Sequence, residues 1–525
     1  MVSDLPRLAE PIIFTNVFQV WGHLYSFSFE PNANWTREYP SQEELHKYLI
    51  GVANEWRLYE NIRFNCPVEE ARWDDSSKKW TVRVRRPAQV NRHEPQIQTF
   101  TADFVISAVG QLSLPSYPDI PGIDQFHGKV MHSARWDWDY NLEGKRVAVV
   151  GTGSTSAQIV PAIAPYVKSL AVFQRSPTWV MPRHDAPIGK SRRLGYQLIP
   201  GMLQARRREL MDLRESHFKA GFDVESDAHA HVMEVSRNHL QTQLSGSWNA
   251  ELRCKLTPQY PFSCKRIVVS DDLYPALARE NVRLETSRVS RITPSGIEMQ
   301  SGECYDVDAI ILATGFQTTK FLHPIKIYGR NGHPLEAAWD QGAAAYLGIT
   351  ISDFPNLGML YGPNTNLAYN SLILPIEAQS QYISRLVSAV LSAKRKGQTL
   401  AIEPRPDVVA RYNDWIQDRL SKSTFADPRC SSWFKTADGK ITNNWCGSAI
   451  EYQERTSYID WSDFDFAGTA ADSWRDKTVT RWKRVVEESQ PWNALYLRYS
   501  CLLVSVVMAL ALYFQVGGHM LITLS

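Results

Sequence analysis

A glycine-rich turn followed by an arginine carries the clearest chemical signal in the chain. Gly151 and Gly153 come directly after the apolar run Val147–Val150, and a helical pattern begins at Ser156. Glycine lets the backbone turn tightly and approach a pyrophosphate, while a helix N-terminus offers free N–H groups and a partial positive charge. The residues predicted to bind the phosphates of a dinucleotide are therefore Gly151, Thr152, Gly153, Ser154, Thr155 and Ser156.

Arg175 indicates which dinucleotide binds there. A second apolar run, Leu170–Phe173, ends in Gln174 and Arg175, about 20 residues beyond the turn, where this fold selects its nucleotide. An acidic residue at that point would bind the ribose 2′-hydroxyl of NAD, whereas an arginine suits the 2′-phosphate of NADP. Ser156 replaces the third glycine of the pattern, so the alternative stays open that Arg175 is a surface residue in an α/β domain with another ligand.

Short apolar runs must position these residues. Val147–Val150 and Leu170–Phe173 have the pattern of buried parallel strands. Two further runs end in a glycine turn, Phe104–Gly110 (FVISAVG) and Val307–Phe316 (VDAIILATGF). Between residues 191 and about 256 the chain is rich in Arg, Glu, Leu and His and is predicted to form a helical insertion. Together these patterns predict an α/β fold.

Length, charge and cysteine content exclude several classes of protein. A chain of 525 residues with 44% hydrophobic and 21% charged residues is an ordinary globular protein of two or three domains. A net charge of +2 gives no support to nucleic-acid binding. The seven cysteines have no zinc-like spacing, so no metal site is predicted and a reducing, cytosol-facing location fits best. The basic run Arg206–Arg208 is predicted to be a solvent-exposed helix face.

The C-terminal stretch has a different composition. Residues 499–525 contain no Asp, Glu, Lys or Arg, and residues 499–516 form an 18-residue largely apolar run, at the short end of what crosses a bilayer. Lys483, Arg484 and Arg498 precede it, which would keep the rest of the chain in the cytosol. We therefore expect a polar linker over 471–498 and a C-terminal apolar helix that anchors the protein to an intracellular membrane such as the ER; the alternatives are a buried C-terminal helix and a cytoplasmic protein.

The segment before the glycine-rich turn carries a second motif. Phe126-x-Gly128-x-x-x-His132-x-x-x-Trp136-Asp137 resembles the F-x-G-x-x-x-H-x-x-x-W-[P/D] fingerprint of type I Baeyer–Villiger monooxygenases. The related flavin-containing monooxygenases, which oxidise nitrogen or sulfur, usually carry Tyr or Phe at the position of Trp136. The resemblance implies an FAD- and NADPH-dependent monooxygenase that inserts one oxygen atom of O₂ into a ketone, with a heteroatom-oxidising enzyme as the alternative.

The resemblance also implies a domain organisation. Two dinucleotide-binding, Rossmann-like domains are expected: 1–140 as the first part of the FAD domain with a linker, 141–318 as the NADP domain and 319–470 as the second part of the FAD domain. The family's FAD domain opens with its own G-x-G-x-x-G, whereas Met1–Val20 contain no glycine. We therefore expect an FAD domain that is N-terminally incomplete. The alternatives are a gene model that begins too late and an inactive NADP-binding remnant.

A Lys-Arg pair is the implied catalytic element. The family has such a pair, with the arginine over the flavin, where this chain has Lys265 and Arg266. Arg266 is thus implied to stabilise the anionic peroxide and its ketone adduct, since a guanidinium stays charged and has planar donors. Lys265 is implied to bind the 2′-phosphate together with Arg175. Without the resemblance, a Lys-Arg pair after a proline loop would usually be a solvated turn.

The remaining implied residues lie in the fingerprint and in two turns. His132, Trp136 and Asp137 belong to the catalytic set, with His132 positioning the hinge between domains rather than carrying a proton. The turn that ends Val307–Phe316 resembles the family's crossing from the NADP to the FAD domain, and Gly362–Thr365 resembles its flavin-side G-P-N-T loop. The cofactor-binding residues implied by these turns are Ala313, Thr314, Gly315, Asn364 and Thr365.

The overall pattern resembles fungal monooxygenases of polyketide secondary metabolism, including those that open ring ketones. The resemblance therefore implies a hydrophobic ketone and O₂ as substrates and an ester or lactone as product. The 17 tryptophans and the apolar C-terminal stretch are compatible with a hydrophobic substrate. Nothing in the sequence specifies an oligomeric state.

Overall fold

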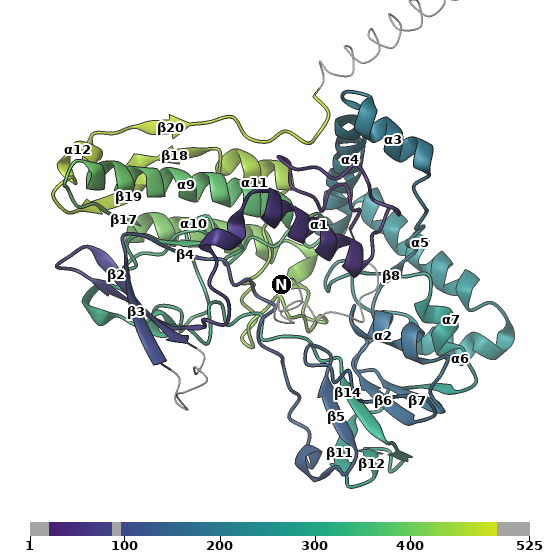
Figure 1. The fold of residues 1–525 in the computed structure, drawn as a ribbon. Helices are drawn as coiled ribbons and strands as arrows, with labels where there is room; N and C mark the ends of the chain where they lie inside the picture. Colours follow the sequence, from purple (N-terminus) through teal and green to yellow (C-terminus); the bar gives the residue numbers. More distant parts are fainter. Residues whose placement is uncertain (1–19, 87–95, 491–525) are drawn as a thin grey trace, which may run out of the picture.

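A five-stranded parallel sheet lies beside the glycine-rich turn, at the lower right of Figure 1. The computed structural model describes residues 20–86 and 96–490 of the chain. The strands, in spatial order, are β10 (Val282–Glu285), β7 (Ser169–Phe173), β6 (Arg146–Val150), β14 (Ala309–Leu312) and β5 (Lys129–His132). All neighbouring pairs are parallel, and β10-β7-β6-β14 has the 3-2-1-4 order of a dinucleotide-binding domain.

Both faces of this sheet are covered, as parallel strands require. Successive side chains point to opposite faces, so Val147 and Val149 pack with the helices, whereas Ala148 packs with an antiparallel sheet. The predicted strands 147–150 and 170–173 are confirmed, and the helix begins at Ser156 as the sequence predicts. The covering elements are α2 (Ser156–Ile163), α7 (Leu273–Leu277), β11 (Val289–Thr293), β12 (Gly296–Met299) and β13 (Cys304–Asp306).

A second body, at the left of Figure 1, holds an extensive apolar cluster of the described residues. Its helices are α9 (Ile373–Arg395), α10 (Pro406–Ser421) and α11 (Ala449–Arg455), with α1 (Gln42–Glu55) on its edge. Its larger sheet has the order β15 (Lys326–Tyr328), β1 (Val68–Asp74), β2 (Lys79–Arg86) and β3 (Gln96–Ala102). Its smaller elements are β17 (Ala401–Pro404), β19 (Phe464–Ala467), α8 (Leu335–Ala338) and η6 (Thr424–Ala426). A separate two-stranded pair lies on the parallel-sheet side and consists of β8 (Val180–Met181) and β9 (Val268–Val269).

A short parallel pair lies where the FAD domain is expected. The predicted strand in Phe104–Gly110 is β4 (Val105–Ser107), which pairs with β16 (Leu357–Met359). Within residues 20–86 and 96–490 no third strand joins this pair, and Ile106 in β4 is 49% exposed. Residues 20–41 contain turns and no named strand. The described part of the expected FAD domain therefore has only two strands in this sheet.

Four helices occupy the predicted insertion: α3 (Lys190–Leu198), α4 (Met202–Phe222), α5 (Asp227–Gln243) and α6 (Ala250–Leu256). The 21-residue α4 places Leu210 and Met211 in the apolar cluster of the second body. Leu203 on the same helix packs with Trp35 in a smaller cluster. Helix α4 therefore packs against the second body (Figure 1), whereas α5 and α6 place Leu240 and Leu256 in the apolar cluster of the parallel sheet.

The prediction that Arg206–Arg208 form a solvent-exposed face is wrong for Arg207. Its side chain is 4% exposed, and the guanidinium forms an ion pair with Glu487 through Nε–Oε2 at 3.0 Å and Nη2–Oε1 at 2.6 Å. It also donates to the Ser26 hydroxyl at 2.9 Å. The helical pattern could not reveal this burial because the covering segments are distant in the sequence.

The predicted polar linker 471–498 packs against the protein as far as residue 490. Strand β20 (Val479–Arg481) pairs with β18 (Tyr458–Asp460), preceded by the short helix α12 (Asp472–Arg475). Ser489 N–H donates to Asp212 on α4 at 3.0 Å. The apolar helix predicted for 499–525 lies outside the described residues, and no helix among those described has both the length and the apolar character needed to cross a bilayer.

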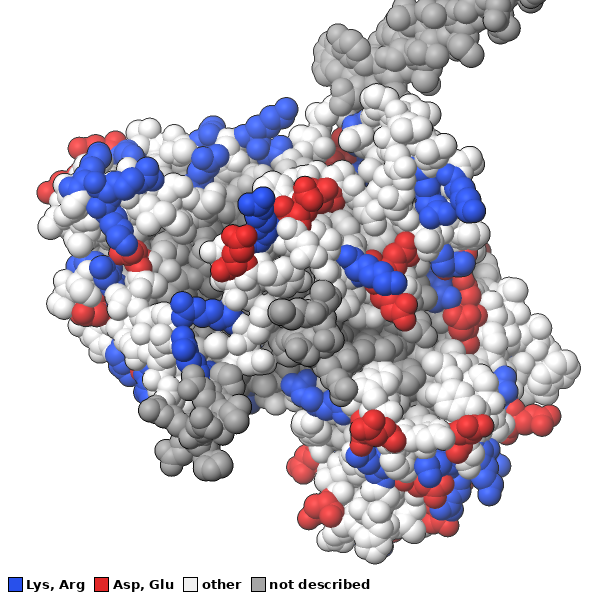
Figure 2. Space-filling view, in the orientation of Figure 1, with Lys and Arg blue, Asp and Glu red and all other residues white. Residues whose placement is uncertain are grey.

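Charged side chains are mixed over the visible surface. Figure 2 shows Lys and Arg interspersed with Asp and Glu on the face in view, with no broad basic area there. This agrees with the net charge of +2.

We predict that Arg207→Met destabilises the protein strongly. Removing one partner of a buried ion pair leaves the other charge buried and uncompensated, which costs about 3–5 kcal/mol. Urea denaturation should show a loss of that size in the free energy of unfolding. The control is Arg208→Met, one residue further on, for which a change within about 0.5 kcal/mol is expected. Equal effects of the two substitutions would contradict the structural role of the Arg207–Glu487 pair.

Candidate active site

The two glycines of the turn have different structural roles. Gly151 has a φ of +111°, and a Cβ added there would lie 2.6 Å from the carbonyl oxygen of Ala313. A Cβ added at Gly153 would meet no atom within 4 Å. Gly151 is therefore required for the close packing of β6 against the end of β14, whereas Gly153 leaves open space above the turn.

The N-terminus of α2 faces the same turn. Thr155 is its N-cap residue and makes no side-chain capping hydrogen bond. Thr152 Oγ1 donates to the carbonyl of Ser176 at 3.2 Å, and Gln158 Nε2 donates to the carbonyl of Ser154 at 3.1 Å. Ser156 is buried, and its hydroxyl has no partner within the described part of the chain. Backbone N–H groups at the start of a helix fit a phosphate group.

Arg175 and Lys265 come together beside the turn although 90 positions separate them in the sequence (265 − 175). Lys265 Nζ donates to the Ser176 hydroxyl at 2.5 Å, and Arg175 Nη2 donates to the Ser431 hydroxyl at 3.2 Å. Burial, and then the Arg175 charge, lower the pKa of Lys265 to about 8. No carboxylate in the described ranges pairs with either side chain, so the two cations fit the 2′-phosphate of NADP.

Gln174 does not join this group. It is buried, and its Nε2 donates to the carbonyl of Lys255 in α6 at 2.7 Å. The side chain therefore connects β7 to the helical insertion and is turned away from the predicted phosphate site.

A disulfide lies next to the Lys-Arg pair. Cys264 is joined to Cys430, with the two Cα atoms 6.1 Å apart and a sequence separation of 166 positions. The bond connects the loop of Lys265 to the loop of Ser431, which contacts Arg175. The cysteine spacing did not predict this pair, because spacing along a chain does not show which thiols meet in space, and the expectation of a reducing location rested on that spacing.

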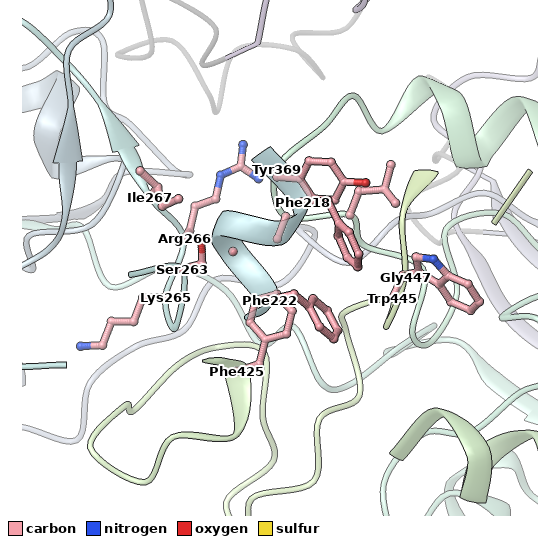
Figure 3. Close-up of a pocket in the computed structure, with 13 residues that line it drawn as sticks. Phe218, Phe222, Ser263, Lys265, Arg266, Ile267, Tyr369, Phe425, Trp445 and Gly447 are labelled. Carbon is pink, nitrogen blue, oxygen red and sulfur yellow. The ribbon is translucent and has the colours of Figure 1, made fainter. Parts of the chain in front are cut away.

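Arg266 lines a cavity that is partly open to solvent (Figure 3). Burial lowers the pKa of its guanidinium, while Tyr361 and Tyr25 act in the opposite direction. Among the described residues it has neither an ion pair nor a hydrogen bond. A buried cation without such partners is costly, so the position fits a group that binds or stabilises an anion.

The cavity wall contains residues that the sequence reasoning missed. Phe218 and Phe222 lie four positions apart on α4, a spacing that places them on one helix face. This pair of aromatic residues at helical spacing was a signal that could have found them. The other aromatic lining residues come from separate loops and had no such signal: Tyr369, Phe425 and Trp445.

The fingerprint residues lie elsewhere. His132 ends β5, with its Nδ1 accepting from Ala134 N–H at 3.0 Å and its ring against Tyr117 and Phe316. Burial lowers its pKa. Trp136 packs partly buried against the apolar cluster of the parallel sheet, and Asp137 forms an ion pair with Lys129. None of the three predicted catalytic residues His132, Trp136 and Asp137 lines the Arg266 cavity.

The Ala313–Gly315 turn lies where two chain crossings meet. Thr314 Oγ1 donates to the carbonyl of Ser116 at 2.5 Å, and Ser116 N–H donates to the carbonyl of Gly315 at 2.8 Å. Ala313 supplies the carbonyl beneath Gly151. His132 packs against the same place through Phe316, so it lies at the junction of the two bodies.

Asn364 and Thr365 are buried and shape a loop. Asn364 Nδ2 donates to the carbonyls of Ile441 and Asn444 at 2.8 and 3.0 Å, and Thr365 Oγ1 donates to the carbonyl of Gly362 at 2.7 Å. The loop continues into residues 367–369, which line the Arg266 cavity. The side chains of Asn364 and Thr365 therefore support the loop that forms part of the cavity wall. The polar groups that they donate are hydrogen-bonded to backbone carbonyls of the protein.

The two cofactors fit the described residues to different degrees. For NADP, the protein offers an open glycine turn, a helix N-terminus without a side-chain cap and two cationic side chains. For the flavin ring, the residues implied by the resemblance are Arg266 and those of the 362–369 loop. In residues 20–86 and 96–490 no glycine-rich strand–turn–helix lies next to β4 to hold the pyrophosphate of FAD.

Comparison with known proteins gives the family. Residues 13–198 match the family model described as flavin-binding monooxygenase-like. The chain is 43% identical over 471 residues to the FAD-binding monooxygenase ktnD of Aspergillus niger, covering 90% of this chain and 77% of that protein. It is 37% identical over 442 residues to a Baeyer–Villiger monooxygenase of Streptomyces coelicolor, with 84% and 82% covered.

Solved structures agree with the sequence relatives. OTEMO in complex with FAD and NADP superimposes with a TM-score of 0.73 at 25% identity, covering 87% of this chain and 92% of that one. Cyclohexanone monooxygenase from Rhodococcus sp. Phi1 bound to NADP⁺ has a TM-score of 0.72 at 25% identity, with 89% and 90% covered. The chain therefore belongs to the flavin-binding monooxygenase family and is a Baeyer–Villiger-type monooxygenase that uses FAD and NADP(H).

Proposed function

We propose that this enzyme converts a ketone into an ester or lactone. One atom of O₂ enters between the carbonyl carbon and its neighbour: the carbon–carbon bond breaks, and the inserted oxygen forms one new bond to each of these two carbons. The other oxygen atom leaves as water, with two electrons from NADPH and one proton from solvent. The observation that carries the proposal is the partly buried Arg266 residue, which lines a mostly apolar cavity without an anionic partner among the described residues.

Arg266 acts on the negative charge that develops on oxygen during the insertion. Its guanidinium stays protonated and presents planar donors, so it can stabilise two oxygen atoms at once. The aromatic wall makes one side of the cavity apolar, which strengthens the electrostatic interaction at that side. FAD reduced by NADPH supplies the activated oxygen when both are bound.

The NADP end is assigned to the glycine turn and the two cations. Gly153 and the N-terminus of α2 would hold the pyrophosphate, and Arg175 with Lys265 would bind the 2′-phosphate. Lys265 and Arg266 are neighbours, so the residue that grips NADPH and the one that faces the oxygen chemistry lie on one short loop. His132 acts by position, as part of the junction between the two bodies.

We further propose a place in fungal polyketide metabolism. The 43% identity to ktnD of Aspergillus niger supports it. The aromatic lining of the cavity also fits the hydrophobic, ring-containing ketones that such pathways produce.

Arg266→Ala should abolish oxygen insertion and leave NADPH binding intact. Loss of one preorganised donor to developing charge lowers the turnover rate about 10²–10³-fold. NADPH binding should stay unchanged because Arg266 is not one of the residues assigned to the 2′-phosphate. Ester formation is followed by gas chromatography, and the NADPH dissociation constant by calorimetry. Arg266→Lys, which keeps the charge and loses the planar fork, should recover only part of the rate. Normal ester formation by Arg266→Ala would refute the assignment.

NADPH affinity should fall as pH rises through about 8. The lowered pKa of Lys265 means that this side chain loses its proton at about 8 in the free protein, and only the charged form attracts the 2′-phosphate. Between pH 7 and pH 9 the protonated fraction falls about tenfold, and the NADPH dissociation constant should rise in proportion. Lys265→Met should bind weakly with a flat profile. A pH-independent wild-type constant would remove Lys265 from the site.

Gly151→Ala and Gly153→Ala should affect different properties. The first places a Cβ 2.6 Å from a carbonyl oxygen at positive φ, so it should lower the free energy of unfolding by about 1–3 kcal/mol. The second adds a methyl group to open space, so stability should change by less than about 0.5 kcal/mol while NADPH affinity falls. Thermal unfolding and calorimetry on both variants make the comparison, and unchanged NADPH affinity in Gly153→Ala would argue against phosphate binding at this turn.

A further inference from the structure

The wall of the Arg266 cavity is a connected series of aromatic rings. Tyr369 and Phe218 have ring centroids 5.7 Å apart, Phe218 and Phe222 are 4.9 Å apart, and Phe222 and Phe425 are 5.7 Å apart. Trp445 completes the aromatic lining. Figure 3 shows these rings gathered on one side of the cavity, with Arg266 next to them.

The first of these rings is held in a fixed orientation. The hydroxyl of Tyr369 donates to Glu215 Oε1 at 3.0 Å and accepts from Ala449 N–H at 2.8 Å. The hydroxyl is therefore engaged with α4 and the start of α11, and Tyr369 offers its ring to the cavity. Asn370 donates to the same Glu215 oxygen at 3.0 Å, which fixes the loop further.

Phe218 and Phe222 are held by the helix that carries them. Helix α4 is attached to the second body through the Arg207–Glu487 ion pair and through its apolar residues in the large cluster. A ligand that packs against rings already in place does not have to order them on binding. The wall is thus preorganised for a flat apolar surface.

Charge is present at one place in this lining. Lys265 and Arg266 are the charged residues that line the cavity, and Lys265 Nζ is bonded to Ser176. In Figure 3 the Lys265 side chain extends away from the rings. The cavity therefore suits a molecule that is apolar and flat over most of its surface and has one polar atom, the carbonyl oxygen, close to Arg266.

We propose that the substrate is a ketone whose carbonyl is attached to or fused with an aromatic ring, and that Phe218 and Tyr369 select it. This rests on the ketone oxidation proposed above. Aromatic rings gain edge-to-face and offset contacts with one another that a saturated ring of the same size does not. The cavity is partly open to solvent, so a ring can reach the aromatic wall from that opening.

The test compares 1-tetralone with 1-decalone. The two ketones share a ten-carbon bicyclic skeleton and the carbonyl position, and they differ in that one ring of 1-tetralone is aromatic. Equilibrium dialysis against the full chain loaded with FAD and NADP⁺ gives both dissociation constants without relying on turnover. Contacts with two rings predict that 1-tetralone binds about tenfold more tightly. A separate assay with NADPH and O₂ gives kcat/KM for both ketones.

Phe218→Leu removes one ring and keeps an apolar side chain of similar size. It should weaken 1-tetralone binding about fivefold and change 1-decalone binding by less than twofold. Phe222→Leu provides a second variant should Phe218→Leu lower the melting temperature. Phe29→Leu is the matched control, since this ring is 54% exposed and does not line the cavity.

The outcomes separate the two proposals. A preference for 1-tetralone that is lost in Phe218→Leu supports the aromatic substrate class. Equal binding of both ketones, tighter binding of 1-decalone, or binding of neither overturns it. Oxidation of both ketones with equal kcat/KM would uphold ketone oxidation and overturn the aromatic class. Tight, Phe218-dependent binding of 1-tetralone without any ester product would uphold the selectivity of the cavity and overturn ketone oxidation.

Discussion

Enclosing the Arg266 guanidinium is the constraint from which the rest of the site follows. Removing a cation from water costs several kcal/mol even after the protein relaxes, and no carboxylate in the described residues offsets that cost. In return, a charge that is only partly hydrated before a ligand arrives acts more strongly on developing negative charge than one in bulk water.

Helix α4 gives this site its shape. It starts from the parallel-sheet body, yet its buried face belongs to the other body through Leu210 and Met211. The same helix carries Glu215, which fixes Tyr369, and the two phenylalanines of the wall. One element therefore determines where the cavity is, which rings line it and how firmly they are held.

Local patterns predicted the fold well where the physics is local. The strands of the parallel sheet alternate between two covered faces, and the glycine at 151 is required by a positive φ and a carbonyl 2.6 Å away. Arg175 and Lys265 lie together beside the turn and Arg266 lines a cavity, while the roles assigned to these three residues stay predictions. The errors concern long-range contacts: Arg207 meets a carboxylate 280 positions away, and Cys264 meets a thiol 166 positions away. His132, Trp136 and Asp137 have the family spacing, but spacing alone does not show that they lie outside the cavity.

The two chain crossings at Ser116 and Gly315 run side by side and are hydrogen-bonded to each other. Both connections between the parallel-sheet body and the second body therefore pass through one place, and each restrains the backbone of the other. A substitution that removes the Thr314 hydroxyl would loosen both connections at once.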